Sequence, residues 1–130
     1  MAFTKYRVLI YSENPDKLKD FYRDVFGFEE IEHLDLPGDY GYMMKVVGDY
    51  HVWVGKHSEI HGKAQESFRH LFNLYPEEGV EYWYNKVKDN PEITVVAKPF
   101  LAPFSTPDDQ WWFATVLDPE GNCWQFVGKK

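Results

Sequence analysis

Short runs of β-branched and aromatic residues, separated by turn residues, make up much of this chain, and apolar residues with a helical period replace them in two places. The first helical segment follows a β-branched and aromatic stretch, residues 6–12. In the stretch "KLKDFYRDVFGF" that follows, Leu18, Phe21, Tyr22 and Val25 fall on one side of a helix, which Asn14 or Asp16 can cap and Gly27 can end. This pattern predicts a strand followed by an amphipathic helix.

The same order of elements occurs twice. Strand-like stretches at 29–36, 40–47 and 50–56 follow the first helix, and turn residues separate them. The second half has a strand at 68–75, a helix at 80–90, and strands at 93–101, 111–118 and 123–129. The sequence therefore predicts an α+β fold of two tandem βαβββ modules.

The two modules are predicted to span about residues 1–56 and 68–130 of a single domain, residues 1–130, with a polar linker at about 57–67. One module can cover only one face of its sheet with its helix. We therefore expect the modules to form a half-closed mixed-sheet cleft with the helices outside, and a ligand to bind there.

Composition narrows the class of partner. The formal net charge of −7 argues against nucleic acid, because phosphates would be repelled. The chain has no apolar run that predicts a signal peptide or a membrane span, and its lone cysteine allows no intrachain disulfide. We expect a cytoplasmic protein without a membrane partner. The high aromatic content, 18%, suggests rings that line a pocket or a homodimer interface.

Two motifs resemble those of a known superfamily. The stretches "NPDKLKDFYRDVFGF" (residues 14–28) and "LDPEGNCWQF" (residues 117–126) are similar to the first helix and the closing strand-turn-strand of the vicinal oxygen chelate superfamily, which includes glyoxalases, bleomycin-resistance proteins and extradiol dioxygenases. The Asp-Pro-Glu-Gly-Asn turn itself needs only turn chemistry: Asp118 can accept backbone N–H groups, and Gly121 tolerates a positive φ.

Metal-dependent members of this superfamily bind one divalent ion through His and Glu side chains on the first and last strands of each module. The resemblance puts the corresponding positions at Arg7, Leu71 and Gln125, none of which suits a divalent cation. A shift of one residue in the strand of the second module would turn His70 inward in place of Leu71. On the remaining strand, Val52 or else His51 with Trp53 faces inward, and the alternation leaves both registers open. We therefore expect no metal and no other cofactor. If a metal is present, His51 and His70 are its candidate ligands.

The side chains that we expect to point into the cleft include several aromatic rings, one cation and two amides. The predicted ligand-binding residues are Arg7, Tyr11, Trp53, Asn73, Tyr75, Trp112 and Gln125. They suit a small acidic or aromatic molecule, with Arg7 pairing to an acidic group. No catalytic residue is identified.

Two functions remain open from sequence. The first is a metal-independent binder similar to the bleomycin-resistance branch. The second is a divalent-metal-dependent lyase, isomerase or dioxygenase of the glyoxalase and dioxygenase type.

Overall fold

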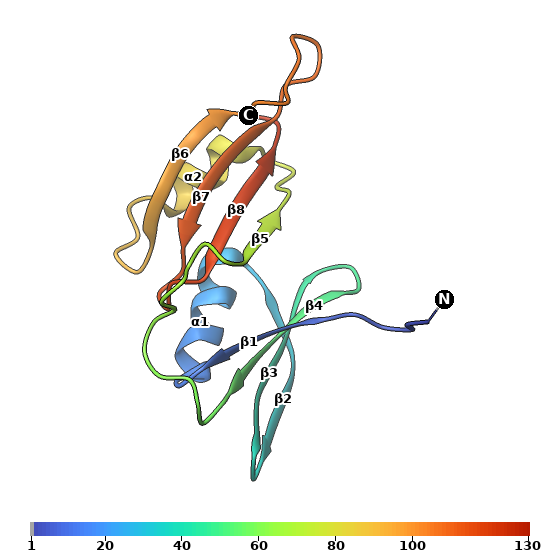
Figure 1. Cartoon of the computed structure of the whole chain (residues 1–130), viewed down its shortest axis with the longest axis vertical. Coiled ribbons are helices and arrows are strands. Elements are labelled where there is room, and N and C mark those ends of the chain that lie inside the picture. Colours follow the sequence, from blue (N-terminus) through green and yellow to red (C-terminus); the bar gives the residue numbers. More distant parts are fainter. Residues whose placement is uncertain (1) are drawn as a thin grey trace. The chain divides into compact units, whose positions relative to one another are not determined.

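The computed structural model describes residues 2–130 as two compact units, one ending at Gly62 and the other running from Lys63 to Lys130. The boundary lies inside the polar segment 57–67. Each unit has one helix and a four-stranded mixed sheet, with no closed barrel, and Figure 1 shows these elements in sequence colours. The predicted α+β fold of two βαβββ modules is confirmed.

The first unit contains one helix and four strands: β1 (Val8–Ser12), α1 (Pro15–Phe26), β2 (Glu29–Leu36), β3 (Asp39–Val47) and β4 (Tyr50–Lys56). Its strand order is β1-β4-β3-β2, with β1 parallel to β4 and the other pairs antiparallel. Helix α1 begins after Asn14, whose Oδ1 accepts from the Lys17 N–H at 3.4 Å, and ends at Gly27 with φ 75°. Of the two predicted capping residues the structure uses Asn14, and the predicted end at Gly27 is confirmed.

The second unit repeats the arrangement with β5 (Leu71–Leu74), α2 (Val80–Val87), β6 (Thr94–Leu101), β7 (Trp112–Leu117) and β8 (Cys123–Gly128). The order is β5-β8-β7-β6, and β5 runs parallel to β8. Strand β5 is shorter than the predicted 68–75. A turn precedes the strand, and in this turn the Arg69 N–H donates a hydrogen bond to the Glu66 carbonyl at 3.1 Å. Pro76 follows the strand two residues after its end.

Each helix packs on one face of its own sheet, so side chains of alternate strand positions go to a covered face and an open face. In β1, Ile10 and Ser12 are buried, whereas Leu9 and Tyr11 are each 39% exposed. In the second unit, Phe126 of β8 contacts Trp83 of α2, with ring centroids 5.9 Å apart. No helix among residues 2–130 is long and apolar enough to cross a membrane.

The turn between β7 and β8 is organised by the buried carboxylate of Asp118. Its Oδ1 accepts from the backbone N–H groups of Glu120 and Asn122 at 2.9 and 3.0 Å, and its Oδ2 accepts from Trp124 Nε1 at 3.1 Å. Gly121 supplies the positive φ, 83°, that the turn requires. The structural interpretation of this motif is therefore confirmed.

Helix α2 begins without a capping side chain, because Gly79 precedes it. The carbonyl oxygens of Lys129 and Lys130 replace that cap by accepting from the N–H groups of Val80 and Glu81, both at 2.9 Å. A Cβ at Gly79 would lie 2.6 Å from the Lys130 oxygen, so the close approach requires glycine. The residues after β8 thus attach the helix to the sheet.

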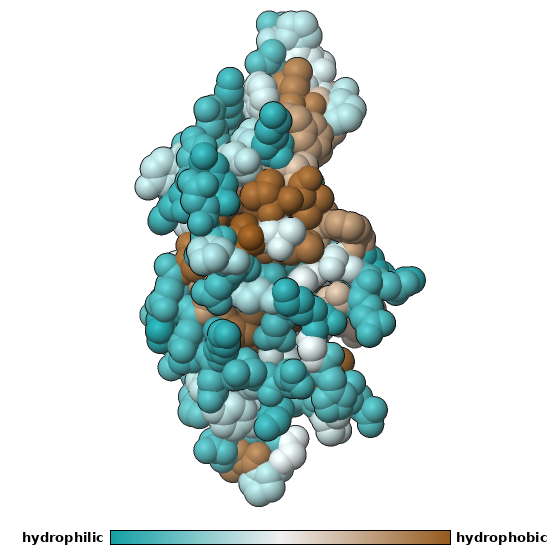
Figure 2. Space-filling model, turned by 90° about the vertical axis from the view of Figure 1, so that its left-hand side faces the viewer, coloured by the Kyte–Doolittle hydropathy of each residue, from teal (hydrophilic) through white to brown (hydrophobic). Residues whose placement is uncertain are grey.

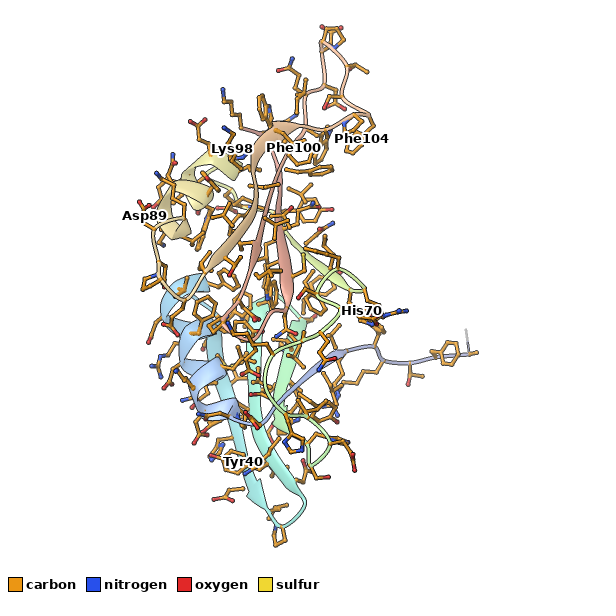
Figure 3. All side chains as sticks on the ribbon, turned by 60° about the vertical axis from the view of Figure 1, so that its left-hand side comes forward. Tyr40, His70, Asp89, Lys98, Phe100 and Phe104 are labelled. Atoms are coloured by element: carbon orange, nitrogen blue, oxygen red, sulfur yellow. The ribbon has the colours of Figure 1, made fainter. Side chains whose placement is uncertain are left out.

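In the first unit, a polar cluster attaches α1 to the sheet. Asp16 Oδ1 accepts from the hydroxyls of Tyr40 (Figure 3) and Tyr42, whose oxygens lie 3.2 Å apart. His33 stacks on Tyr42 with centroids 4.2 Å apart, and Lys19 Nζ lies 4.5 Å from the centroid of the same ring. Hydrogen bonds from Tyr40 and Tyr42 lower the pKa of Asp16, and burial is the main cause that raises the pKa of Tyr42.

We expect Asp118→Ala to lower the free energy of unfolding by about 3 kcal/mol, because a buried indole N–H and two backbone N–H groups lose their acceptor. Urea denaturation followed by circular dichroism measures this. Asp108→Ala, at an exposed loop position, is the control and should change stability little. Equal effects of the two substitutions would contradict the role given to Asp118.

The Asp16 cluster should make stability depend on acid. The folded-state pKa of Asp16 lies below the ordinary 3.8, so its contribution is present above pH 3.8 and is lost as the pH falls through the lower folded value. The stability difference between the wild type and Asp16→Asn should therefore shrink on acidification. Denaturant titrations at a series of acidic pH values test this, with Asp89→Asn, 88% exposed, as the control. A pH-independent difference would refute it.

Candidate functional site

The open face of the second sheet carries a row of neutral polar side chains across three neighbouring strands. Asn73 of β5 pairs with Gln125 of β8, and Gln125 pairs with Thr115 of β7, so the three side chains share one face. Gln125 Nε2 donates to Thr115 Oγ1 at 3.2 Å. Asn73 is exposed and its amide has no hydrogen bond within residues 2–130. We call Asn73, Gln125 and Thr115 the amide row.

Apolar side chains flank the amide row on both sides. The row two residues nearer to the β7–β8 turn consists of Leu71, Cys123 and Leu117. The row two residues farther from that turn consists of Val127, Phe113 and Phe100. Cys123 is fully buried, and burial is the main cause that raises the pKa of its thiol. A buried, protonated thiol is a weak nucleophile, so Cys123 acts here as a small apolar residue.

A shallow recess of about 580 Å³ opens at one end of this face. The segment before β5 and one residue of β7 line it: Gln65, Glu66, Ser67, Phe68, Arg69 and Leu117. Arg69 is already paired with Glu66, with Nε and Oε2 2.6 Å apart. The recess therefore offers no unpaired charge from these two residues.

On the open face of the first sheet, the indole of Trp53 lies across two glycines. Trp53 pairs with Leu9 and Met43, while Gly55 pairs with both Tyr11 and Gly41. A Cβ at Gly55 would lie 2.3 Å from Trp53 Nε1, and a Cβ at Gly41 would lie 2.7 Å from Trp53 Cζ2. The missing side chains make the space that the ring occupies. Tyr11 lies beside it and makes an edge contact with His57, centroids 5.0 Å apart.

Basic groups border this aromatic surface. His51 shares the face of Trp53 and pairs with Lys45 of β3. This register resolves the choice that the sequence left open, because Val52 is buried on the face that α1 covers. Arg7 directly precedes β1, is exposed, and has no ion pair within residues 2–130.

Three predicted site residues lie elsewhere. Trp112 pairs with Gly128 and so shares a face with Ala114 and Phe126, on the opposite side of the sheet from Gln125; Lys130 Nζ lies 4.9 Å from the centroid of its ring. Tyr75 follows β5 and is 65% exposed. His70, labelled in Figure 3, precedes β5 and is exposed in a loop.

The placement of Trp112 corrects the sequence expectation, because its face is set by pairing with β8. Alternation within the two adjacent tryptophans could not decide which of them faces the amide row. The sequence also gave no sign of the Thr115 contact or of the Phe100 and Phe113 neighbours, since all three depend on strand register.

The donor set does not fit a divalent metal of the kind that the family resemblance implies. Residues 2–130 contain no group of three or more His, Cys, Asp or Glu side chains placed to hold an ion. The positions that the resemblance singles out supply a guanidinium at Arg7, an alkyl group at Leu71 and an amide at Gln125. A guanidinium cannot ligate, and a neutral amide is a weak anchor for a divalent cation.

Comparison with known proteins supports the fold. A family model described as Glyoxalase/Bleomycin resistance protein/Dioxygenase superfamily matches residues 6–126. No curated protein matches the chain.

Similar solved structures include a hypothetical protein from S. aureus, with 18% identity, 98% coverage of each chain and a TM-score of 0.71. A family enzyme from Burkholderia phytofirmans PsJN has 22% identity, covers 93% of this chain and 94% of its own, and gives 0.69. A lactoylglutathione lyase from Agrobacterium tumefaciens has 22% identity, with 95% and 92% coverage and a TM-score of 0.62. At these identities the likeness concerns the fold alone.

We expect Gly55→Ala to displace the Trp53 indole, because the new methyl group would overlap its Nε1. The indole N–H resonance of Trp53 should shift in a two-dimensional NMR spectrum, and Trp53→Phe assigns that resonance. Ser58→Ala, at an exposed position of the same unit, is the control. An unchanged Trp53 signal in Gly55→Ala would show that the ring does not rest on the glycines.

Proposed function

Because the chain belongs to the Glyoxalase/Bleomycin resistance protein/Dioxygenase superfamily, we propose that it binds small organic molecules without a metal ion, each on the open face of one sheet. The observation that carries this proposal is the Gln125 amide, which Thr115 holds at 3.2 Å in the middle of the amide row. A fixed, neutral amide at this position favours orienting a ligand by hydrogen bonds over coordinating an ion.

The first unit supports an acidic or aromatic ligand. Arg7 has a guanidinium without an ion pair within residues 2–130, and a guanidinium binds carboxylates and phosphates through parallel hydrogen bonds. Tyr11, which is 39% exposed, supplies aromatic surface on the same sheet face as Leu9, and the largely buried indole of Trp53 lies beside it. In this proposal Arg7 pairs with an acidic group of a ligand and the rings contact its planar part.

The proposal includes a homodimer in the cytoplasm. Strand β6 is an edge strand with several exposed apolar side chains. It lies in the upper half of Figure 1, and hydrophobic residues, coloured brown, gather on the surface of the upper half in Figure 2. On this strand, Val95, Val96 and Leu101 are the exposed apolar residues that a dimer contact would use. A second copy would cover such a surface, and light scattering gives the oligomeric state. The single cysteine supports a reducing compartment.

Metal analysis and a ligand screen test the main proposal together. Protein purified without chelator should contain no stoichiometric divalent ion, and compounds that raise its melting temperature should do so equally with and without chelator. A stoichiometric ion whose removal abolishes ligand binding would contradict metal independence and favour the lyase, isomerase or dioxygenase alternative. A screen without any hit would count against binding itself.

Substitution of Arg7 tests its role. For acidic hits, Arg7→Ala should weaken binding by about tenfold, the effect of losing one charge-assisted pair, as measured by calorimetry. Lys5→Ala removes a nearby exposed cation and serves as the control. Equal effects of both substitutions would mean that Arg7 contributes only to the overall charge.

A further inference from the structure

Three phenylalanine rings gather at one end of the open face of the second sheet. Phe113 of β7 contacts Phe100 of β6, with centroids 5.6 Å apart, and Phe104 from the following loop, with centroids 5.8 Å apart. Figure 3 shows Phe100 and Phe104 at the same end of the unit. Phe100 is 40% and Phe104 is 62% exposed, so the cluster presents ring surface that the chain itself leaves uncovered. We call Phe100, Phe104 and Phe113 the phenylalanine cluster.

The loop between β6 and β7 is held by its own hydrogen bonds, which keep Phe104 near the sheet. The Ala102 N–H donates to the Trp111 carbonyl at 2.8 Å. Ser105 Oγ donates to that carbonyl at 3.1 Å and accepts from the Trp111 N–H at 2.9 Å. Phe104 also lies 6.3 Å from Trp111, centroid to centroid. An exposed aromatic ring on a pre-ordered loop loses little conformational entropy when a ligand covers it.

The phenylalanine cluster and the amide row occupy neighbouring positions on the same face of β7. Phe113 and Thr115 are two residues apart on β7 and point to the same face, which places them about 7 Å apart along the strand. Thr115 in turn holds Gln125. A ligand in contact with both must therefore carry a ring and a hydrogen-bonding group separated by about that distance.

The chemistry of the amide row selects a neutral group. After donating one N–H to Thr115, the Gln125 amide retains its carbonyl oxygen and a second N–H, and Asn73 adds another amide. Donors and acceptors of this kind suit a group that also has both, such as a carboxamide.

The flanking rows supply no counter-charge for an ionised ligand group. Lys98 extends on the other side of β6 from Phe104 in Figure 3, and Lys129, which lies over Trp111, is paired with Asp109, with Nζ and Oδ1 3.4 Å apart. A charge placed on this face would lose hydration without gaining a partner.

We infer that the open face of the second unit binds an uncharged molecule with an aromatic ring and a carboxamide-like group about 7 Å apart, the ring on the phenylalanine cluster and the polar group on Gln125. Phe104 is the residue that selects for the ring. This inference rests on the proposed small-molecule function and adds the class of ligand that the second unit takes. The acidic group assigned to Arg7 concerns the first unit only.

Three probe molecules test separately whether the ligand needs an aromatic ring and whether its polar group must be uncharged. They are phenylbutanamide, with its ring and carboxamide at opposite ends of a three-methylene chain, its carboxylate analogue phenylbutanoate, and butanamide, which lacks the ring. Saturation-transfer NMR and calorimetry at millimolar concentration measure their binding to the full chain. Phenylbutanamide should bind at least about tenfold more tightly than either of the others, because only this probe satisfies both the ring contact and the neutral row.

Two variants test the residues. Phe104→Ala should weaken phenylbutanamide binding about fivefold to tenfold, the effect of losing one aromatic contact. Gln125→Leu should weaken it while leaving the affinity for the ring fragment toluene unchanged. Phe68→Ala is the matched control, since Phe68 is an equally exposed aromatic residue, 67% against 62%, in a segment away from the phenylalanine cluster. Circular dichroism confirms that each variant is folded.

The outcomes distinguish this inference from the proposed function. If phenylbutanoate binds as tightly as the amide, if Phe104→Ala matches Phe68→Ala, or if phenylbutanamide does not bind while hits from the ligand screen do, the inference is wrong and the proposed function stands. If neither the probes nor any screened compound binds, both fail.

Discussion

The carboxylate of Asp118 determines how the second unit presents its open face. By accepting from two backbone N–H groups and from the indole of Trp124, it fixes the turn that joins β7 to β8. That turn sets the strand register, and the register places Thr115 opposite Gln125. A slip of one residue would turn every side chain of one strand to the other face and would separate the two. The buried carboxylate of Asp118 therefore determines which side chains meet in the amide row.

The alternation of the strands predicts much of this arrangement. It places Arg7, Leu9 and Tyr11 on one face of the first strand, and the same rule places Asn73 and Gln125 together, as the pairing of β5 with β8 shows. The boundaries of α1 also follow from local chemistry, because a capping Asn and a left-handed Gly act within one turn of the chain.

The same rule fails where both faces of a strand are apolar. Strand β4 alternates between residues that would suit either face, so only its pairing with β1 shows that Trp53 lies beside Leu9. For the same reason, only the pairing with β8 shows that Trp112 lies on the face opposite Gln125. Contacts that bring distant segments together leave no local pattern either. The return of Phe104 onto Phe113 and the bonding of Asp16 to Tyr40 and Tyr42 are of this kind, and sequence periodicity could not have found them.

The two units share a topology but differ in the charge of their open faces. In the first, Lys45 and His51 are direct partners across β3 and β4, and Arg7 stands next to β1. In the second, the central positions hold Asn73, Gln125 and Thr115, which carry no charge. Electrostatic complementarity governs which ligands each face accepts more than how tightly it holds them. Duplicated modules of one fold can thus recognise chemically different ligands. These charge differences lie at exposed or half-buried positions such as Arg7, Lys45 and Asn73, because other side chains of the same faces, such as Trp53 and Cys123, are buried and apolar.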